Sequence, residues 1–447
     1  MTMIALGGVI GAGLFVGSSV VIKAAGPAAV ISFLITGLLV VLVMKMLGEM
    51  AVALPGVGSF YEFIRFAVGD MAGFLTGWMY WYFWVIVIGI EAIAGAQLLR
   101  FWLPDLPLWI GSLSIMALLT LCNLMSVRTY GEAEFWFASV KVAAIVVFLF
   151  LGFLFTIGLW PIATPGLHNL VAFGGFAPNG YLPVLTGAVA ATGFYFGAEL
   201  VTVAAAEAAE PAKAIANATN SVIARVLIFY VGSILLIVAI VPWNRAEITT
   251  PYVSALKMMG VPAAAQIMNA VILTAVLSAL NSGLYASSRI LFALTKTGDA
   301  PSTLARVSRN GVPVRAILLG TVFGYGAILM SYISPDRVFA FLVNSYGTVA
   351  LFVYLLIAVA HLRLRGRLER DKSHVLNAKM WGYPYLTYGA IIAMLTILTG
   401  MAFIPDQCLP LIMGVASLAA IALGYAVKRL SLSRPAARLT PPAGSHP

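Results

Sequence analysis

The chain has 447 residues, of which 62% are hydrophobic and only 9% are charged. Soluble domains carry about 25% charged residues, so this composition excludes soluble globular, disordered, disulfide-rich and collagen-like classes. The net charge of +10 does not indicate nucleic-acid binding, because the basic residues follow the pattern of a membrane topology. We predict an all-α polytopic membrane protein.

Apolar stretches of about 20 residues, the length that a transmembrane helix needs, recur along the whole chain. They predict twelve transmembrane helices, at 4–22, 28–51, 72–98, 107–126, 135–158, 183–204, 221–242, 263–293, 313–333, 338–360, 382–403 and 408–428. Most Lys and Arg residues fall on one side, which the positive-inside rule assigns to the cytoplasm together with both termini. No cleavable signal peptide is expected, because the first segment lacks a basic leader and a cleavage site.

These helices predict one integral membrane domain over residues 1–430, followed by a cytoplasmic tail at 431–447. The densest basic cluster, at 363–379, fills the predicted loop between the tenth and eleventh helices. Orientation and contact with anionic lipid explain this cluster better than a regulatory site does.

The first predicted helix is interrupted by glycine, with four glycines among the seven residues from Gly7 to Gly13. A glycine-rich interruption leaves backbone N–H and C=O groups without hydrogen bonds, and hydrocarbon cannot satisfy them. Such an interruption therefore persists only where it lines a cavity or a packed interface. Close helix packing through small residues is the alternative explanation.

Glu91 lies deep in the third predicted helix, far from either end. A charged group at this depth is costly and therefore indicates a function. It could bind a substrate amine, carry a proton, or hold a neighbouring helix through hydrogen bonds. The aromatic run at 78–84, which opens the same helix, is predicted to form an interfacial belt rather than a ligand cage.

Lys141 lies in the fifth predicted helix and is followed by a long apolar run. Burial would disfavour its charged form, so it is a candidate to gain and lose a proton during transport. A lysine that extends to the inner membrane surface is the alternative.

The sixth predicted helix is also interrupted, between Gly193 and Leu200, and carries Glu199 in the break. Breaks in the first and sixth helices indicate an inverted-repeat transporter, here with repeats at 4–158 and 183–360 and two extra helices at 382–428. Unwound backbone offers N–H groups to a carboxylate and carbonyls to an ammonium, which together suit a zwitterionic amino acid. We expect Glu199 to support the break by hydrogen bonding rather than to contact substrate.

Polar residues in the eighth predicted helix are mostly explained by helix packing. Asn281 and Ser282 are the best candidates to face a cavity. Glu207 and Glu210, at the inner end of the sixth helix, are predicted to form solvated salt bridges.

No cofactor or metal site is expected. The four histidines are predicted to lie in loops or the tail, and the two cysteines have no metal-ligand spacing. A membrane-embedded enzyme would need a nucleophile with a base, or a metal, and the predicted helices contain no histidine for either purpose. A channel filter and a phosphate-binding loop of an ATP-driven pump are also absent from the sequence.

Several strings resemble bacterial amino-acid permeases of the amino acid/polyamine/organocation superfamily. They are Gly8 to Ser19, Met46 to Ala51 and Gly197 to Glu207. Within the superfamily, the resemblance is strongest to the GABA (4-aminobutyrate) permeases, through Tyr130 to Trp136, Asn217 to Ile223 and Gly298 to Pro301.

This resemblance implies a five-plus-five inverted-repeat fold in the bacterial cytoplasmic membrane, with a small amino acid and protons as partners. It implies that Ile10, Gly11, Ala12 and Gly13 bind the substrate carboxylate. The helix-six backbone at Phe194, Tyr195 and Gly197 would help hold the amine. Lys141 matches the helix-five lysine that takes the place of a sodium ion in sodium-independent relatives, and Glu91 matches a helix-three acid found in permeases for neutral amino acids.

Two departures from the family pattern bear on specificity. Gly193 stands where relatives often place an aromatic gate, a role that Phe194 or Tyr195 would take instead. Ala279 stands where the resemblance predicts cysteine. We expect proton-coupled uptake of GABA or a related ω-amino acid; the alternative is the same mechanism with a neutral α-amino acid such as proline, asparagine or an aromatic amino acid.

Overall fold

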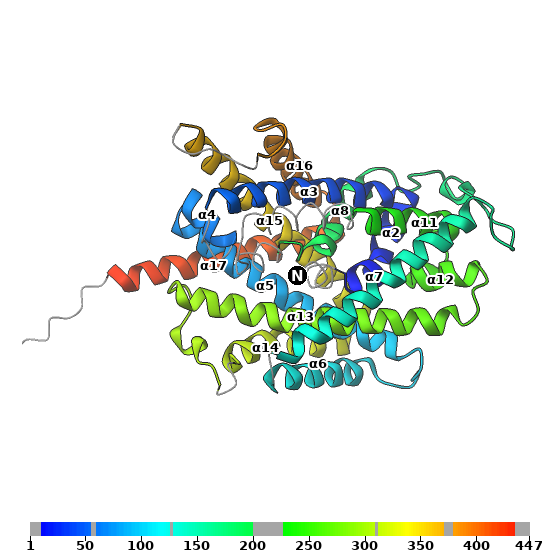
Figure 1. Cartoon of the computed structure of the whole chain (residues 1–447), viewed down its shortest axis with the longest axis horizontal. Helices are drawn as coiled ribbons and strands as arrows, with labels where there is room; N and C mark the ends of the chain where they lie inside the picture. The colour runs from blue at the N-terminus through cyan, green and yellow to red at the C-terminus, as the bar shows by residue number, and fades with distance from the viewer. Residues whose placement is uncertain are drawn as a thin grey trace, which may run out of the picture.

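The computed structural model describes residues 10–54, 60–125, 128–199, 227–308, 312–370 and 379–433. Every regular element in these ranges is a helix, and several long helices run along the longest axis of the molecule while others cross it obliquely (Figure 1). This confirms the predicted all-α class.

The long helices overlap the apolar stretches of the sequence, and two short helices, at Phe60–Val68 and Pro251–Met258, lie between the predicted spans. In chain order they are η1 (Gly13–Gly17), α2 (Ser18–Ala25), η2 (Gly26–Ala28), α3 (Ala29–Ala53), α4 (Phe60–Val68), α5 (Asp70–Leu99), α6 (Leu108–Met125), α7 (Arg128–Thr156), η3 (His168–Leu170), α8 (Leu182–Tyr195), η4 (Ile228–Gly232), α11 (Ser233–Ile240), η5 (Ala246–Thr249), α12 (Pro251–Met258), α13 (Ala264–Lys296), η6 (Ser302–Ala305), α14 (Val314–Ile333), α15 (Pro335–Arg370), α16 (Tyr385–Met401) and α17 (Pro405–Ser433).

Seven helical stretches among the described residues are long and apolar enough to cross a membrane. They include the 41-residue stretch Gly13–Ala53, which joins η1, α2, η2 and α3, and the 30-residue helix α5. Four shorter apolar helices accompany them, at Leu108–Leu124, Leu182–Tyr195, Ile228–Ile240 and Tyr385–Met401. The chain is therefore a multi-pass membrane protein.

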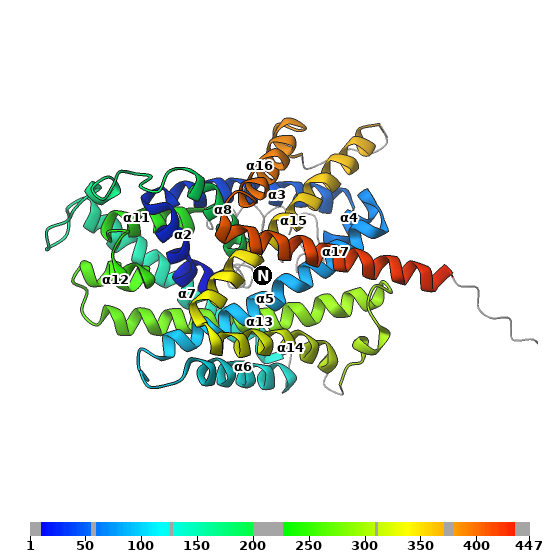
Figure 2. The same cartoon turned by 180° about the vertical axis from the view of Figure 1, so that it is seen from behind.

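Helix α5 lies at the centre of the bundle. It packs against α13, α15, α6 and α4, while α8 packs between α3 and α15. An apolar helix of a membrane protein can face lipid or other helices, and α5 is the most buried of the seven long stretches. Figure 2 shows α15 and α17 on the face opposite to α7. This central position brings the side chains of α5 to the two helix breaks.

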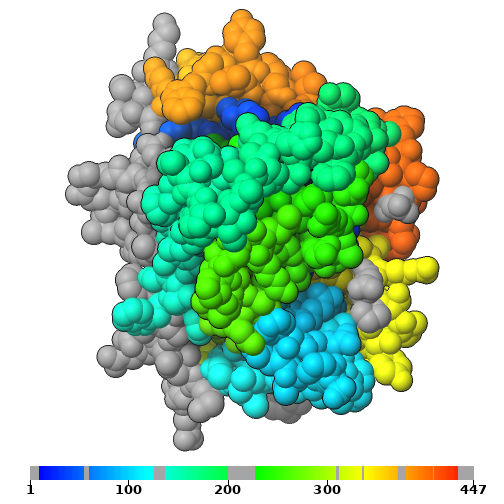
Figure 3. Space-filling view, turned by 90° about the vertical axis from the view of Figure 1, so that its right-hand side faces the viewer, coloured from blue at the N-terminus to red at the C-terminus, as the bar shows by residue number. Residues whose placement is uncertain are grey.

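One end of the molecule is covered by two connecting segments. Figure 3 looks onto this end, where the connection between α7 and α8 and the segment that carries α12 form the surface. One hydrogen bond joins the two segments, since the indole of Trp160 donates to the carbonyl of Met259 at 2.8 Å. Another fixes the cover to the bundle, since the N–H of Ala28 donates to the carbonyl of Phe176 at 2.9 Å.

The predicted loop at the basic cluster is partly wrong. Helix α15 continues to Arg370, and His361, predicted to lie in a loop, is buried within it. Arg365 lies 2.8 Å from the carboxylate of Glu49 on α3, which also accepts a hydrogen bond from the N–H of Met380. The carboxylate of Glu49 balances the charge of Arg365 inside the protein. The helix can therefore continue past the point where basic residues begin.

The Gly298 to Pro301 string forms a second buried ionic cluster. Gly298 turns the chain after α13 with φ +70°, and the buried Asp299 carboxylate binds Arg65 of α4. Lys428 of α17 lies 2.6 Å from the other oxygen of the same carboxylate. This acid joins three separate helices at the end of the bundle where α17 leaves it.

Candidate functional site

Within the predicted first helix, regular helical structure among the described residues begins only with η1 at Gly13, and residues before 10 lie outside them. We refer to the non-helical backbone before η1 as the first break, and two ionisable side chains bind it. The N–H of Ala12 donates to both carboxylate oxygens of Glu91, at 3.0 and 3.1 Å. The ammonium of Lys141 donates to the carbonyl of Ile10 at 3.1 Å. A carboxyl group thus accepts from a backbone donor, and an amino group donates to a backbone acceptor, within three residues of chain.

Both side chains come from other helices and are enclosed. Glu91 lies on α5 and is 4% exposed, and Lys141 lies on α7 and is fully buried. The alternative in which Lys141 extends to the membrane surface is wrong, because its ammonium lies against the helix-one backbone. Of the three roles open to Glu91, holding a neighbouring helix is the contact seen in this conformation.

Gly11 permits this approach. A Cβ atom at residue 11 would overlap Oε1 of Glu91 and lie 2.8 Å from Cβ of Ala279 on α13. Only a residue without a side chain fits between α5 and α13 here.

The sixth predicted helix also loses its helical structure inside the predicted span, at the last residues described before residue 200, and we refer to this segment as the second break. Helix α8 ends at Tyr195, Phe196 is extended (φ −68°, ψ 142°) and Gly197 has φ +111°. The N–H of Gly197 donates to Oε1 of Glu199 at 2.9 Å, and the hydroxyl of Tyr230 donates to the carbonyl of Phe194 at 2.8 Å. Glu199 therefore makes the kind of contact expected of it; Glu207 and Glu210 lie outside the described residues.

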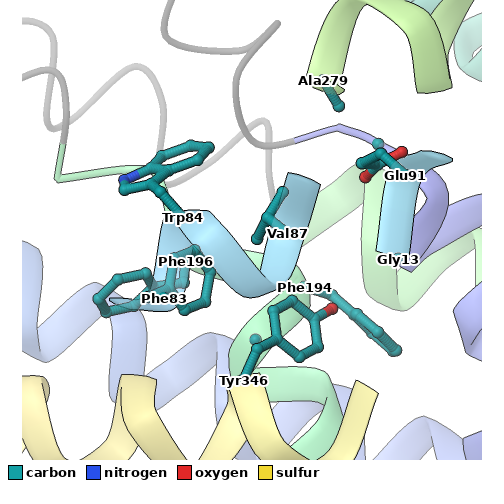
Figure 4. Close-up of a pocket in the computed structure, with 11 residues that line it drawn as sticks. Gly13, Phe83, Trp84, Val87, Glu91, Phe194, Phe196, Ala279 and Tyr346 are labelled. Atoms are coloured by element: carbon teal, nitrogen blue, oxygen red, sulfur yellow. The ribbon is translucent and has the colours of Figure 1, made fainter. Parts of the chain in front are cut away.

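A small cavity lies between the two breaks. Figure 4 shows Glu91, Gly13 and Ala279 towards one end and Phe83, Trp84 and Phe196 towards the other. The lining residues are Gly11, Gly13, Phe83, Trp84, Val87, Glu91, Gly193, Phe194, Phe196, Ala279 and Tyr346.

The space beside Gly193 is filled by an aromatic ring from another helix. A Cβ atom at residue 193 would lie 2.5 Å from Cε1 and Cζ of Tyr346 on α15. Phe194 packs beside the same ring, with centroids 5.9 Å apart (Figure 4). The second candidate gate, Tyr195, is directed away from the cavity, because its hydroxyl donates to the carbonyl of Phe33 at 3.1 Å.

The two candidates on α13 are not among the residues that line the cavity. The amide oxygen of Asn281 accepts a hydrogen bond from Asn123 on α6 at 2.6 Å, and Ser282 is buried. Ala279 faces the cavity instead. Ile10, Ala12 and Gly197 contribute backbone groups at the two breaks rather than cavity wall.

Several aromatic residues that line the cavity were not predicted from the sequence. The predicted interfacial belt is wrong for Phe83 and Trp84, which are each 1% exposed and line the cavity. Helical spacing could have found them, since residues 84, 87 and 91 fall on one face of α5. Tyr346 gave no comparable signal, because nothing local marks it as facing α8.

Comparison with known proteins extends these observations. A family model described as amino acid permease matches residues 1–427. The chain is 51% identical over 409 residues to a gamma-aminobutyric acid permease of Bacillus subtilis (strain 168), covering 91% of this chain and 87% of the relative. It is 49% identical over 412 residues to a probable GABA permease of Pseudomonas aeruginosa, with 91% and 86% covered. It is 46% identical over 415 residues to a gamma-aminobutyric acid permease of Escherichia coli (strain K12), with 92% and 89% covered.

Proposed function

This chain belongs to the amino acid permease family, and we propose that it imports GABA or a related ω-amino acid together with protons by alternating access. Members of this family are membrane transporters rather than enzymes. The observation that carries the proposal is the buried N–H of Ala12, which already holds a carboxylate at the edge of a small cavity.

The proposed architecture has twelve transmembrane helices, with inverted repeats at 4–158 and 183–360 and two additional helices at 382–428. Both termini lie in the cytoplasm of a bacterium, and residues 431–447 form the tail. The two helix breaks on opposite sides of one cavity support this arrangement, because discontinuous helices at a repeat interface form the binding site of such transporters.

In the proposed complex, the substrate carboxylate binds the helix-one backbone between Ile10 and Gly13. The substrate ammonium lies towards Glu91 and the backbone carbonyls near Phe194. The faces of Phe194 and Tyr346 pack on the methylene chain between the two charged groups, and aromatic faces also attract an ammonium.

The cavity wall supports an unbranched substrate. Tyr346 packs directly on Gly193, and its ring forms the cavity wall on this side, so a substrate without a side chain on its α-carbon needs the least room there. GABA carries no such side chain. The three relatives named above are GABA permeases, so the α-amino-acid alternative is less favoured.

Lys141 is the proposed proton carrier. Its ammonium contacts the carbonyl of Ile10, and loss of the proton would leave that carbonyl with a weaker partner at the helix-one break. A change in the charge of one buried group would thereby alter the segment that binds substrate.

The test is uptake of labelled GABA into proteoliposomes, with and without an inward proton gradient, in the presence of unlabelled amino acids. We expect gradient-driven accumulation that ω-amino acids inhibit and neutral α-amino acids do not. Accumulation of another amino acid but not of GABA would refute the substrate assignment, and accumulation that ignores the proton gradient would refute the coupling.

A further inference from the structure

The N–H group proposed to bind the substrate carboxylate is occupied by a carboxylate of the protein itself. Both oxygens of Glu91 lie within 3.1 Å of the nitrogen of Ala12, and Glu91 also lines the cavity. Glu91 is the only acidic residue among the described residues that line it. The side chain therefore belongs to the binding site and to the helix-one break at once.

One N–H group cannot hold two carboxylates at full strength. Two carboxylates that share a site repel each other, and at least one must leave or lose its charge. The packing leaves no room for a second carboxylate here, since Glu91 and Ala279 fill the space beside Gly11.

We propose that Glu91 is an internal substitute for the substrate carboxylate, and that substrate binds by displacing Glu91 from the N–H of Ala12. This inference rests on the proposed function, because it assumes a substrate that carries a carboxylate. The exchange keeps the helix-one break hydrogen-bonded in both states, so neither state leaves a buried donor without a partner.

The released Glu91 carboxylate remains inside the cavity. The charged and titratable groups that face it are Lys141 of α7, Tyr230 of η4 and Tyr346 of α15. A substrate ammonium would add a cation on the cavity side and so stabilise the displaced position. The exchange therefore favours a substrate that carries both a carboxylate and an ammonium over a molecule that carries only one.

The test separates these two charges with three probes. Binding of GABA, butyrate and propylamine is measured calorimetrically on purified wild-type protein, Glu91→Gln and Glu247→Gln. Glu247→Gln is the matched control, because it removes the same charge from an exposed residue of η5.

We expect Glu91→Gln to bind butyrate about tenfold more tightly than wild type does, since a neutral acceptor competes less for the N–H of Ala12. Propylamine should gain nothing in Glu91→Gln, and Glu247→Gln should match wild type with all three probes.

Unchanged butyrate binding in Glu91→Gln, or an equal gain for propylamine, would overturn the proposal. Should Glu91→Gln fail to fold, infrared difference spectroscopy on the wild-type protein decides instead. Addition of GABA with a carbon-13 carboxylate should shift a protein carboxylate band separately from the substrate band, and the absence of any protein carboxylate shift would refute the displacement.

Failure of the proposed function gives a different result. If another amino acid replaces GABA as the substrate, GABA binding and uptake are lost, yet the butyrate gain in Glu91→Gln persists. If the displacement is wrong, GABA uptake by the wild type persists and the butyrate gain is absent.

Discussion

The two helix breaks satisfy their free backbone groups in different ways. At the first break, Glu91 and Lys141 reach the chain from α5 and α7, and both partners are ionisable. At the second break, the N–H of Gly197 is bound by Glu199, only two residues away. The second break also has partners from elsewhere, since the carbonyl of Phe194 accepts a hydrogen bond from Tyr230 of η4 and Glu199 accepts one from Tyr354 of α15. The difference therefore lies in the N–H groups: the N–H at the first break is bound by a side chain of another helix, whereas the N–H at the second is bound by a side chain of its own segment.

This difference assigns different roles to the two breaks. A partner on another helix can leave when a ligand or a proton changes its charge, and its departure changes how the helices are held together. A partner two residues away moves with the segment that it binds. We infer that the first break responds to substrate and protons, while the second keeps a fixed shape. Three substitutions test this contrast.

Lys141→Ala should have the largest effect. It removes the cation that holds the carbonyl of Ile10, and we expect proton-driven accumulation of GABA to be abolished while exchange of bound substrate stays measurable. The measurement is accumulation in proteoliposomes with an inward proton gradient. Lys257→Ala, at an exposed position of α12, is the control and should accumulate GABA normally. Full accumulation by Lys141→Ala would remove Lys141 from the coupling mechanism.

Gly11→Ala should lower the initial rate of GABA uptake by about tenfold to a hundredfold. The added methyl group overlaps Glu91 and approaches Ala279, and overpacking of this kind typically costs about 1–3 kcal/mol. Gly326→Ala on α14 is the matched control, because its Cβ atom would meet nothing within 4 Å. Uptake is compared at equal amounts of monodisperse protein. Equal rates for the two variants would show that close packing at the first break does not matter.

Glu199→Ala should have the smallest effect on transport and act mainly on stability. It leaves the buried N–H of Gly197 without an acceptor, which we expect to lower the free energy of unfolding by about 1–3 kcal/mol. Thermal unfolding measures this loss, and Glu199→Gln, which keeps an acceptor, should recover most of it. A collapse of GABA affinity in Glu199→Gln, with stability intact, would contradict the structural role of the second break.

The segments that form the two breaks could be predicted from the sequence. Glycine placement and the buried charges at residues 91 and 141 marked the correct segments, because an unusual residue in an apolar helix is visible without any partner. The predictions that His361 lies in a loop and that Phe83 and Trp84 lie at the membrane interface were wrong. A histidine near basic residues and an aromatic run near a helix start have common explanations in solvent and at the membrane interface, and only their neighbours show otherwise.

The sequence by itself determined the membrane-spanning, all-helical class, the family and the positions of the breaks, since hydropathy and glycine content act locally along the chain. Only the tertiary structure decided that Glu91 meets the N–H of Ala12, that Lys141 meets the carbonyl of Ile10, and that Tyr346 closes the cavity beside Gly193. These pairings depend on how each helix is rotated and how closely it approaches its neighbours. Packing of the whole bundle sets both quantities, and no local pattern encodes them.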